Sequence, residues 1–239
     1  MKKIPKHIVL FPDGNRRWAS KRGLPALQGH LVGRQNFERF LLHCRKRGIK
    51  VLTVFGFSTE NWKRSKEEVN FLMKLFEEGL SDQGSLGKLH KEGVRIKIIG
   101  QKEKLPKSLQ KVIKRIENLT KNNKKFHLNL AVSYGGRWDI LQAVKKIIKK
   151  KTKPEKITED LINRHLTTTG LPEPDLVIRA GGERRFSNFL LWQSAYAELY
   201  FSNKLWPDFS EKDFEKALED FAQRERRFGG KKVKQYLKV

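Results

Sequence analysis

The segment Asp13–Trp18, with the sequence DGNRRW, follows directly after a short apolar run, His7–Phe11. A carboxylate, a glycine and two arginines at the end of a strand are side chains that suit a diphosphate. The glycine lets the backbone approach the phosphates, the arginines pair with their oxygens, and Asp13 can hold a divalent ion. The competing interpretation is an N-capping aspartate followed by surface arginines.

Two further segments combine polar, cationic and glycine residues at the ends of predicted strands. They are Phe57–Arg64 (FSTENWKR) and Arg179–Ser187 (RAGGERRFS). For the first, a turn that only caps the next helix is the alternative. Because the carboxyl ends of parallel strands meet at one edge of a sheet, we expect the three segments to converge. Together they predict an anion pocket large enough for more than one phosphate group.

The elements that must position these segments alternate between strand and helix, which predicts an α/β fold. We expect a single domain over residues 1–239, with a basic tail from about 231, built on a mostly parallel central sheet of about six strands flanked by helices. The predicted strands are His7–Phe11, Val51–Phe57, Arg95–Ile99, Phe126–Val132, Asp175–Arg179 and Glu198–Phe201. The predicted helices are Gly33–Arg47, Glu67–His90, Leu105–Thr120, Arg137–Lys149, Glu159–Leu166, Phe189–Ala197 and Glu211–Arg226.

The chain is strongly basic, with 52 Lys and Arg against 26 Asp and Glu in 239 residues, a net charge of +26. Such a charge attracts nucleic acid, anionic lipid or phosphorylated small molecules. Lysine runs such as Lys145–Lys153 are more typical of solvated surfaces than of binding sites. A nucleic-acid-binding protein is therefore one alternative. However, no familiar reader motif is present, and we expect no specific nucleic-acid partner.

Cysteine content and apolar runs indicate a cytoplasmic protein. The single cysteine, Cys44, cannot form an internal disulfide, which fits a reducing compartment. No stretch approaches the roughly 20 apolar residues of a membrane span. The basic surface nevertheless favours a peripheral contact with the anionic inner face of a membrane.

In order and spacing, the motifs resemble those of the undecaprenyl diphosphate synthase family, the cis-prenyltransferases. The resemblance extends from about His7 to Gly230 and rests on an ordered set, which is far more specific than a lone DGN. Its strings are FPDGNRRWA, GH at Gly29 and His30, FSTENWKR, SYGGRWD, DLVIRAGGERRFSNFLLWQSAYAELYF, LWPDF and RERRFGG.

The resemblance implies a Mg²⁺-dependent enzyme that condenses isopentenyl diphosphate onto an allylic diphosphate. Asp13 is implied as the central catalytic carboxylate and, with Glu198, as a metal ligand, and Asn61 stands where a proton acceptor has been proposed. A homodimer is implied as well, with Arg227, Phe228 and Gly229 reaching the partner's site. The implied substrate-binding residues are Gly14, Asn15, Arg16, Arg17, Trp18, His30, Ser58, Thr59, Glu60, Trp62, Arg64, Arg179, Arg185, Phe186 and Ser187.

The resemblance also implies an apolar tunnel for the growing chain, under the segment Glu67–His90. Candidate walls are Phe71, Leu72, Leu75 and Phe76, for which ordinary core packing is the equal alternative. Glycines at 79, 84 and 87 predict a kink or break in this helix.

Two departures from the family pattern leave the primer and product length open. Ala26 stands where many relatives carry arginine, and the tunnel helix carries the unusual glycines. We expect farnesyl diphosphate as primer and a long product such as undecaprenyl diphosphate, the lipid carrier precursor of cell-wall glycans.

Three other functions are alternatives to a long-chain synthase. A synthase of short or branched cis-prenyl diphosphates is the main alternative to a long-chain enzyme. A non-catalytic family subunit fits less well, because the implied catalytic and phosphate-binding residues are retained. The trans-type prenyl synthases are excluded, since no adjacent aspartate pair occurs.

Overall fold

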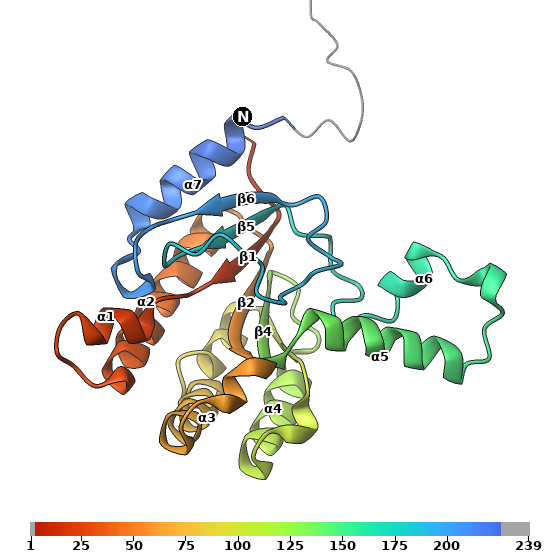
Figure 1. The fold of residues 1–239 in the computed structure, drawn as a ribbon, viewed down its shortest axis with the longest axis horizontal. Helices are drawn as coiled ribbons and strands as arrows, with labels where there is room; N and C mark the ends of the chain where they lie inside the picture. The colour runs from red at the N-terminus through yellow and green to blue at the C-terminus, as the bar shows by residue number, and fades with distance from the viewer. Residues whose placement is uncertain (1–2, 226–239) are drawn as a thin grey trace, which may run out of the picture.

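The computed structural model describes residues 3–225 and has one six-stranded sheet in the order β3-β4-β2-β1-β5-β6 (Figure 1). Every neighbouring pair of strands is parallel. The α/β class and the parallel sheet are thereby confirmed. The strands are β1 His7–Phe11, β2 Val51–Ser58, β3 Val94–Ile99, β4 Phe126–Tyr134, β5 Leu176–Arg179 and β6 Glu198–Phe201.

Seven α-helices connect and cover these strands in the described part of the chain. In Figure 1, α1 and α2 lie to the left of the sheet, α3 and α4 lie below it, α5 and α6 extend to the right, and α7 lies beside β6. The helices are α1 Asn15–Ser20, α2 Ala26–Lys46, α3 Lys66–Leu80, α4 Lys107–Thr120, α5 Gly136–Lys149, α6 Glu159–Asn163 and α7 Glu211–Gln223.

The two faces of the sheet bury separate apolar clusters, as strand β1 illustrates. Ile8 and Leu10 join the larger cluster, which includes residues of α2, α3, α4 and α7. Val9 and Phe11 join a smaller cluster with Phe189 on the other face. Because both faces of the sheet are covered, all five residues of β1 are buried, and the strand does not alternate between buried and exposed side chains.

One predicted helix is wrong. The segment Phe189–Ala197 forms turns, and positive φ angles at Ser187, Asn188 and Leu190 interrupt any helical path. Phe189 and Leu190 are fully buried against the sheet, and the Asn188 carbonyl accepts from the Gly136 amide at 2.6 Å. Tertiary packing therefore overrides the apolar periodicity.

The other differences concern helix ends. The helix predicted from Gly33 begins earlier, at Ala26, and the one predicted to reach His90 ends at Leu80, where the glycines indicated a break. A short 3₁₀ helix, Gly87–Glu92, follows. None of the described helices is long and apolar enough to cross a membrane. The basic tail from about 231 and the residues Arg227, Phe228 and Gly229 lie outside the described residues.

Candidate functional site: an arginine-lined pocket at the carboxyl edge

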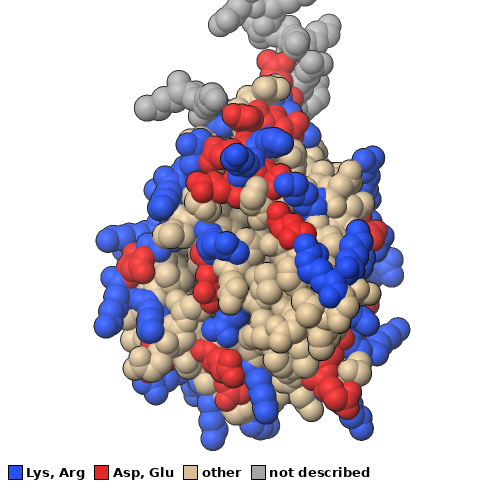
Figure 2. Space-filling model, turned by 90° about the vertical axis from the view of Figure 1, so that its left-hand side faces the viewer, with Lys and Arg blue, Asp and Glu red and all other residues tan. Residues whose placement is uncertain are grey.

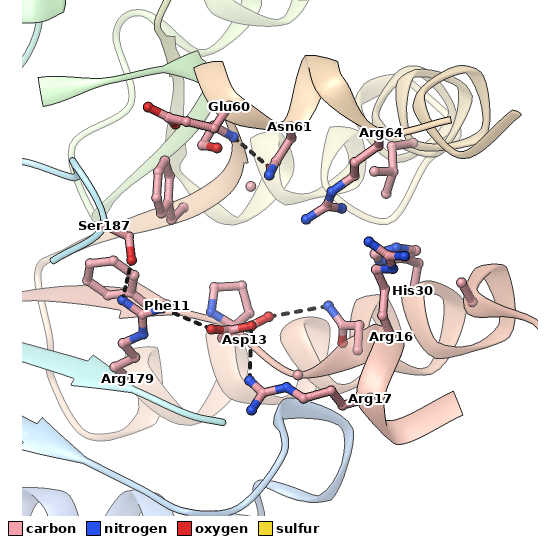
Figure 3. Close-up of a pocket in the computed structure, with 18 of the residues that line it drawn as sticks. Phe11, Asp13, Arg16, Arg17, His30, Glu60, Asn61, Arg64, Arg179 and Ser187 are labelled. Atoms are coloured by element: carbon pink, nitrogen blue, oxygen red, sulfur yellow. Dashed lines mark hydrogen bonds and ion pairs between the residues drawn. The ribbon is translucent and has the colours of Figure 1, made fainter. Parts of the chain in front are cut away.

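A cavity of about 920 Å³ opens where β1, β2 and β5 end (Figure 3). The parallel topology brings together the segments after these strands, as the sequence predicted. Of the implied site residues, Asp13, Gly14, Asn15, Arg16, Arg17, His30, Ser58, Glu60, Asn61, Arg64, Arg179 and Ser187 line the cavity, together with Ala26.

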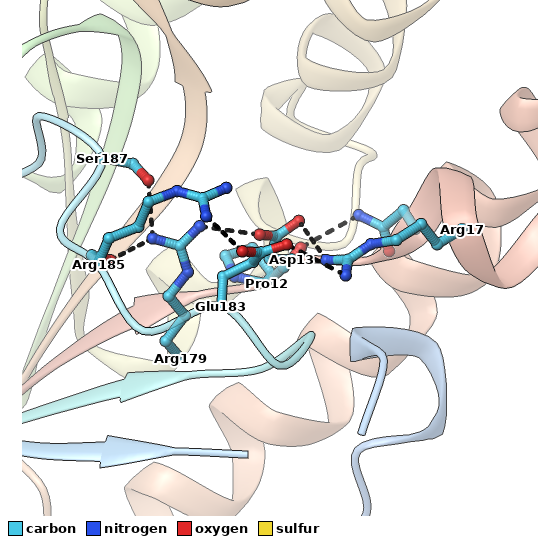
Figure 4. Close-up of polar contacts among 8 residues, drawn as sticks. Pro12, Asp13, Arg17, Arg179, Glu183, Arg185 and Ser187 are labelled. Carbon is cyan, nitrogen blue, oxygen red and sulfur yellow. Dashed lines mark hydrogen bonds and ion pairs between the residues drawn. The ribbon is translucent and has the colours of Figure 1, made fainter. Parts of the chain in front are cut away.

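Asp13 is the centre of one charged group, which we call the Asp13 cluster: Asp13, Arg17 and Arg179 (Figure 4). Its carboxylate accepts from Arg179 Nη2 at 2.9 Å and lies 3.4 Å from Arg17 Nη2. The Arg179 side chain is only 4% exposed, and its Nη1 also donates to Ser187 Oγ at 2.8 Å and to the Arg185 carbonyl. These bonds fix a buried guanidinium before any substrate binds.

Glu183 orients two of the implied phosphate-binding arginines and was not singled out in the sequence. Its carboxylate lies 3.4 Å from Arg17 Nη1 and accepts from Arg185 Nη1 (Figure 4). An acid within the cationic string GGERR was the available signal. An acid in this position can pair with two neighbouring arginines and hold their guanidinium groups in place.

A second group, the Glu68 cluster, consists of Glu68, His30, Arg64 and Arg16. Glu68 Oε1 lies 3.0 Å from both His30 Nε2 and Arg64 Nη1, and Oε2 lies 3.8 Å from Arg16 Nε. Burial alone would raise the pKa of Glu68, but His30 and the two arginines lower it below its usual value. Burial lowers the pKa of His30, against the opposing effect of Glu68. Glu68 is thus a buried, ionised carboxylate that holds His30, Arg64 and Arg16 in position next to the pocket.

Glu68 was also missed from the sequence. Glu68 belongs to the first turn of the amphipathic helix α3, where glutamates are common and usually exposed, so its sequence position did not indicate a buried role. The Ser65 side chain accepts from the Glu68 amide at 3.3 Å, so the same residue sits in the first turn of a capped helix. Its 8% side-chain exposure is what distinguishes it from its neighbour Glu67, which is exposed.

Gly14 and Gly33 let α1 pack tightly at the base of the pocket. Gly14 has φ of 105°, and a Cβ there would lie 2.8 Å from Leu205 Cδ2. A Cβ on Gly33 would lie 2.2 Å from Asn15 Oδ1, in the first residue of α1. A side chain at Gly14 would have to displace Leu205 and adopt a left-handed backbone conformation, and one at Gly33 would have to displace the Asn15 side chain.

Asn61 is both a turn-capping residue and a pocket residue. Its Oδ1 accepts from the Ser58 backbone amide at 3.0 Å, within a capping box. The turn therefore does cap a helix, but capping is not its only role, because Asn61 also lines the pocket. With its oxygen engaged, the side chain has an NH₂ group left to donate, which suits positioning an anion better than accepting a proton.

Several implied substrate contacts do not line the cavity. Trp18 Nε1 donates to Asp208 at 2.7 Å and its ring stacks with Arg22, while Trp62 Nε1 donates to Ser133 Oγ at 2.8 Å. The two indoles therefore connect segments around the pocket: Trp18 is bonded to Asp208, and Trp62 is bonded to Ser133. The residues implied as ligands but absent from the lining are Trp18, Thr59, Trp62, Arg185 and Phe186.

Glu198 is not brought to Asp13 within the chain. It begins β6 and is level with Leu176, which in turn pairs with Ile8, so it lies at the amino end of the sheet. Asp13 follows the carboxyl end of β1. Glu198 Oε2 instead lies 3.0 Å from Arg224 Nη1. The metal role implied for Glu198 stays a prediction, and the arrangement of a single chain does not provide it.

The described residues contain no group of three or more His, Cys, Asp or Glu side chains arranged to hold a metal ion. Mg²⁺ in phosphate sites, however, commonly uses one or two carboxylates together with substrate phosphates and waters. Asp13 is 36% exposed toward the cavity and fits that pattern. The donor set is thus compatible with an ion delivered with a diphosphate.

Lys and Arg elsewhere do not gather into one patch on the face shown in Figure 2, where acidic side chains are interspersed among them. The pocket, in contrast, concentrates Arg16, Arg17, Arg64 and Arg179 around one cavity. Preorganised arginines of this kind can hold the oxygens of two diphosphates and stabilise a departing one.

Comparison with known proteins agrees with this arrangement. A family model described as "Putative undecaprenyl diphosphate synthase" matches residues 11–229. An isoprenyl transferase of Neisseria meningitidis serogroup B is 51% identical, over 95% of this chain and 90% of its own length. The chloroplastic nerylneryl diphosphate synthase of Solanum lycopersicum is 52% identical, over 95% and 71%.

A solved structure is similar across the whole fold. Lavandulyl diphosphate synthase from Lavandula x intermedia, in complex with dimethylallyl diphosphate, has a TM-score of 0.90 and 40% identity, covering 95% of this chain and 98% of that one. With the family match spanning nearly the whole sequence, the chain belongs to the undecaprenyl diphosphate synthase family, the cis-prenyltransferases.

Proposed function

We propose that the pocket joins isopentenyl diphosphate to an allylic diphosphate and so elongates a cis-prenyl chain. The observation that carries this proposal is the cavity itself. It is lined by four arginines and two carboxylates, Asp13 and Glu60, and it adjoins an apolar cavity between α2 and α3. Two diphosphates and a hydrocarbon chain are the ligands that such a pair of cavities suits.

Charge development explains the arginines. The allylic C–O bond breaks, the diphosphate leaves with the electron pair, and the isopentenyl double bond forms the new C–C bond at the allylic carbon. Arg16, Arg17 and Arg64 lie around the cavity, where they would stabilise the charge of the departing diphosphate more in the transition state than in the ground state. Arg179 and Ser187 are assigned to isopentenyl diphosphate.

Asp13 is the residue that would hold Mg²⁺. When bound, the ion would neutralise diphosphate charge and act as a Lewis acid on the leaving oxygens. Asp13 also keeps Arg17 and Arg179 on opposite sides of itself, which separates two anion-binding positions. After C–C bond formation one C–H proton is lost, and we assign it to a diphosphate oxygen or water, with Asn61 as a positioning group.

The primer and the product length are parts of the proposal. Sequence motifs favour farnesyl diphosphate and a long product, such as the undecaprenyl diphosphate used in cell-wall biogenesis. A specific observation favours the short-chain alternative: the apolar cavity measures only about 120 Å³. Ala26 lines the phosphate pocket where an arginine was expected, which removes one contact to the primer diphosphate and leaves the choice of primer to be measured.

The test is a product assay. The purified chain is incubated with Mg²⁺, isopentenyl diphosphate and farnesyl, geranyl or dimethylallyl diphosphate, and the products are identified by mass spectrometry. Products that grow in five-carbon steps with cis bonds support the proposal. No condensation with any of the three primers, in a folded protein, contradicts it.

We further propose a homodimer. Helix α5 exposes Leu141, Val144 and Ile148, and the neighbouring turn segment exposes Leu191 and Tyr196. The start of α5 and that segment are adjacent, because a Cβ on Gly136 would lie 2.9 Å from Leu191 Cγ. Exposed apolar side chains that gather in this way are typical of protein interfaces. Light scattering at the size of one chain would contradict a dimer.

Cytoplasmic location with peripheral contact at an anionic membrane is also a proposal, supported by the net charge of +26. Co-sedimentation with vesicles that contain anionic lipid, compared with neutral vesicles, measures it. Binding that is equal for both kinds of vesicle would contradict an electrostatic contact.

A further inference from the structure

The apolar cavity between α2 and α3 adjoins the arginine-lined pocket. His30 and Leu72 line both cavities, so a chain attached to a bound diphosphate can enter the apolar one directly. Of the four candidate wall residues, Leu72, Leu75 and Phe76 line this cavity, whereas Phe71 does not. The Phe76 ring packs over β2, where a Cβ on Gly56 would lie 3.0 Å from Phe76 Cζ.

Two charged residues, Arg34 and Glu38, lie in the wall of this largely apolar space. Arg34 Nε lies 3.3 Å from Glu38 Oε1 on the same helix, and its Nη1 lies 3.6 Å from Glu78 Oε2 on α3. Its guanidinium carbon would lie 4.0 Å from a Cβ on Gly79. The side chain therefore reaches from α2 across to α3 and rests against the one position in that turn that lacks a side chain.

Arg34 lies deeper than the phosphate pocket. Helix α2 leads from the carboxyl end of β1 back to the amino end of β2, and α3 follows the carboxyl end of β2 and leads back toward β3. Higher residue numbers in both helices therefore lie farther from the pocket. Four residues of α2 separate Arg34 from His30, which is about 6 Å of helix rise. Beyond this level the cavity is bounded by Gly79, Ser85 and Leu86.

The space available is small. The cavity measures about 120 Å³, less than the roughly 150 Å³ of an engineered apolar cavity that accommodates benzene. A chain that outgrows it must displace Arg34 or bury the guanidinium and its two carboxylate partners against hydrocarbon. Burying charged groups without water is costly even when they are paired.

We propose that Arg34, held by Glu38 and Glu78, ends the chain-binding cavity and limits how many isoprene units are added. This inference rests on the proposed chain-elongating function and deepens it by naming a residue that determines product length. Arg34 is a specificity residue and not a catalytic one, because it touches no reacting atom. The charge of Arg34 is essential to this role, because an apolar side chain of similar size would pack favourably against a longer hydrocarbon chain instead of opposing it.

An ordinary surface role makes a different prediction. The Arg34 side chain is 27% exposed, so its stem could simply cover apolar surface while the guanidinium stays in water. In that case the head would move aside as the chain grows. Removing the arginine would then leave the product distribution as it is.

The experiment compares product lengths for the wild-type chain, Arg34→Ala and the control Arg39→Ala. Arg39 is exposed on the same helix and does not line the cavity. With farnesyl diphosphate and excess isopentenyl diphosphate, we expect Arg34→Ala to lengthen the main product by at least two isoprene units and Arg39→Ala to match the wild type. An Arg34→Ala distribution equal to that of the wild type overturns the inference.

A second variant keeps the test decisive if Arg34→Ala fails to fold, as judged by circular dichroism. The double variant Glu38→Gln/Glu78→Gln keeps the arginine and releases it from its partners. We expect a shift in the same direction of about one isoprene unit, and an unchanged distribution overturns the inference. A folded wild type without any condensation contradicts the proposed function itself and with it this inference, whereas an active wild type with unaltered variants contradicts only the role of Arg34.

Discussion

The two charged clusters of the pocket are built around acids in opposite environments. Asp13 is 36% exposed and faces the cavity, whereas the Glu68 side chain is 8% exposed and lies beneath it. Both bind arginines that point to the same space. The exposed carboxylate of Asp13 is therefore available to a substrate or metal ion, whereas the buried carboxylate of Glu68 serves to hold cations in place.

The largest effect is expected at the exposed acid. Asp13→Asn keeps the shape and removes the charge, so it should lower kcat by at least about a hundredfold, in line with the loss of one preorganised electrostatic group. Activity at saturating Mg²⁺ and the Tm are measured together. Near-normal turnover would show that the exposed acid does not take part in the chemistry.

The buried acid should affect both stability and activity. In Glu68→Gln, Arg64 and Arg16 lose their common charged partner, so we expect a loss of about 1–3 kcal/mol in the free energy of unfolding and about a tenfold drop in kcat/KM for the allylic substrate. The matched control is Glu67→Gln, which is exposed on the same helix turn. If Glu67→Gln lowered the free energy of unfolding and kcat/KM as much as Glu68→Gln, the buried acid would have no special role in holding the arginines.

A smaller effect is expected for Glu183→Gln, at the edge of the Asp13 cluster. Arg17 and Arg185 would lose one partner each, but Arg17 keeps Asp13. We expect KM for a diphosphate substrate to rise by about two- to fivefold with little change in kcat, since exposed ion pairs contribute under about 1 kcal/mol. A fall in kcat equal to that of Asp13→Asn would place Glu183 among the reacting groups.

The smallest effect on catalysis is expected at His7, outside both clusters. Nδ1 of this residue lies 2.7 Å from the Pro172 carbonyl and Nε2 lies 2.8 Å from Thr53 Oγ1. Burial lowers the pKa of His7 from 6.5 to about 4. Between pH 6.5 and about pH 4, His7 binds a proton in the unfolded chain but not in the folded one. The contribution of His7 to the free energy of unfolding is therefore fully present above pH 6.5 and falls as the pH drops toward 4.

At about 1.4 kcal/mol per pKa unit, His7 accounts for a loss of about 3 kcal/mol over that range. Urea unfolding at several pH values measures it. In His7→Gln the slope between pH 4 and 6.5 should decrease while kcat at pH 7.5 stays near the wild-type value. Parallel stability curves for the two proteins would show that His7 does not titrate as described.

Much of the fold follows from local patterns. All six strands were predicted within three residues at either end, because buried parallel strands are short apolar runs between polar loops. The failure at Phe189–Ala197 has a physical reason: Phe189 and Leu190 are buried against the sheet through turns, and the positive φ of Leu190 is incompatible with a regular helix. Periodicity alone does not reveal such competition.

For the pocket, the sequence by itself determined the chemical character, since the types and spacing of Asp13, Arg16, Arg17 and Arg179 at strand ends specify an anion site in a parallel sheet. Only the tertiary structure decided which groups work together. It placed Glu68 under His30 and Arg64, left Glu198 at the other end of the sheet, and brought Arg34 across to α3. Burial and distance between segments far apart in the chain depend on how helices pack on the sheet, and no local pattern encodes them.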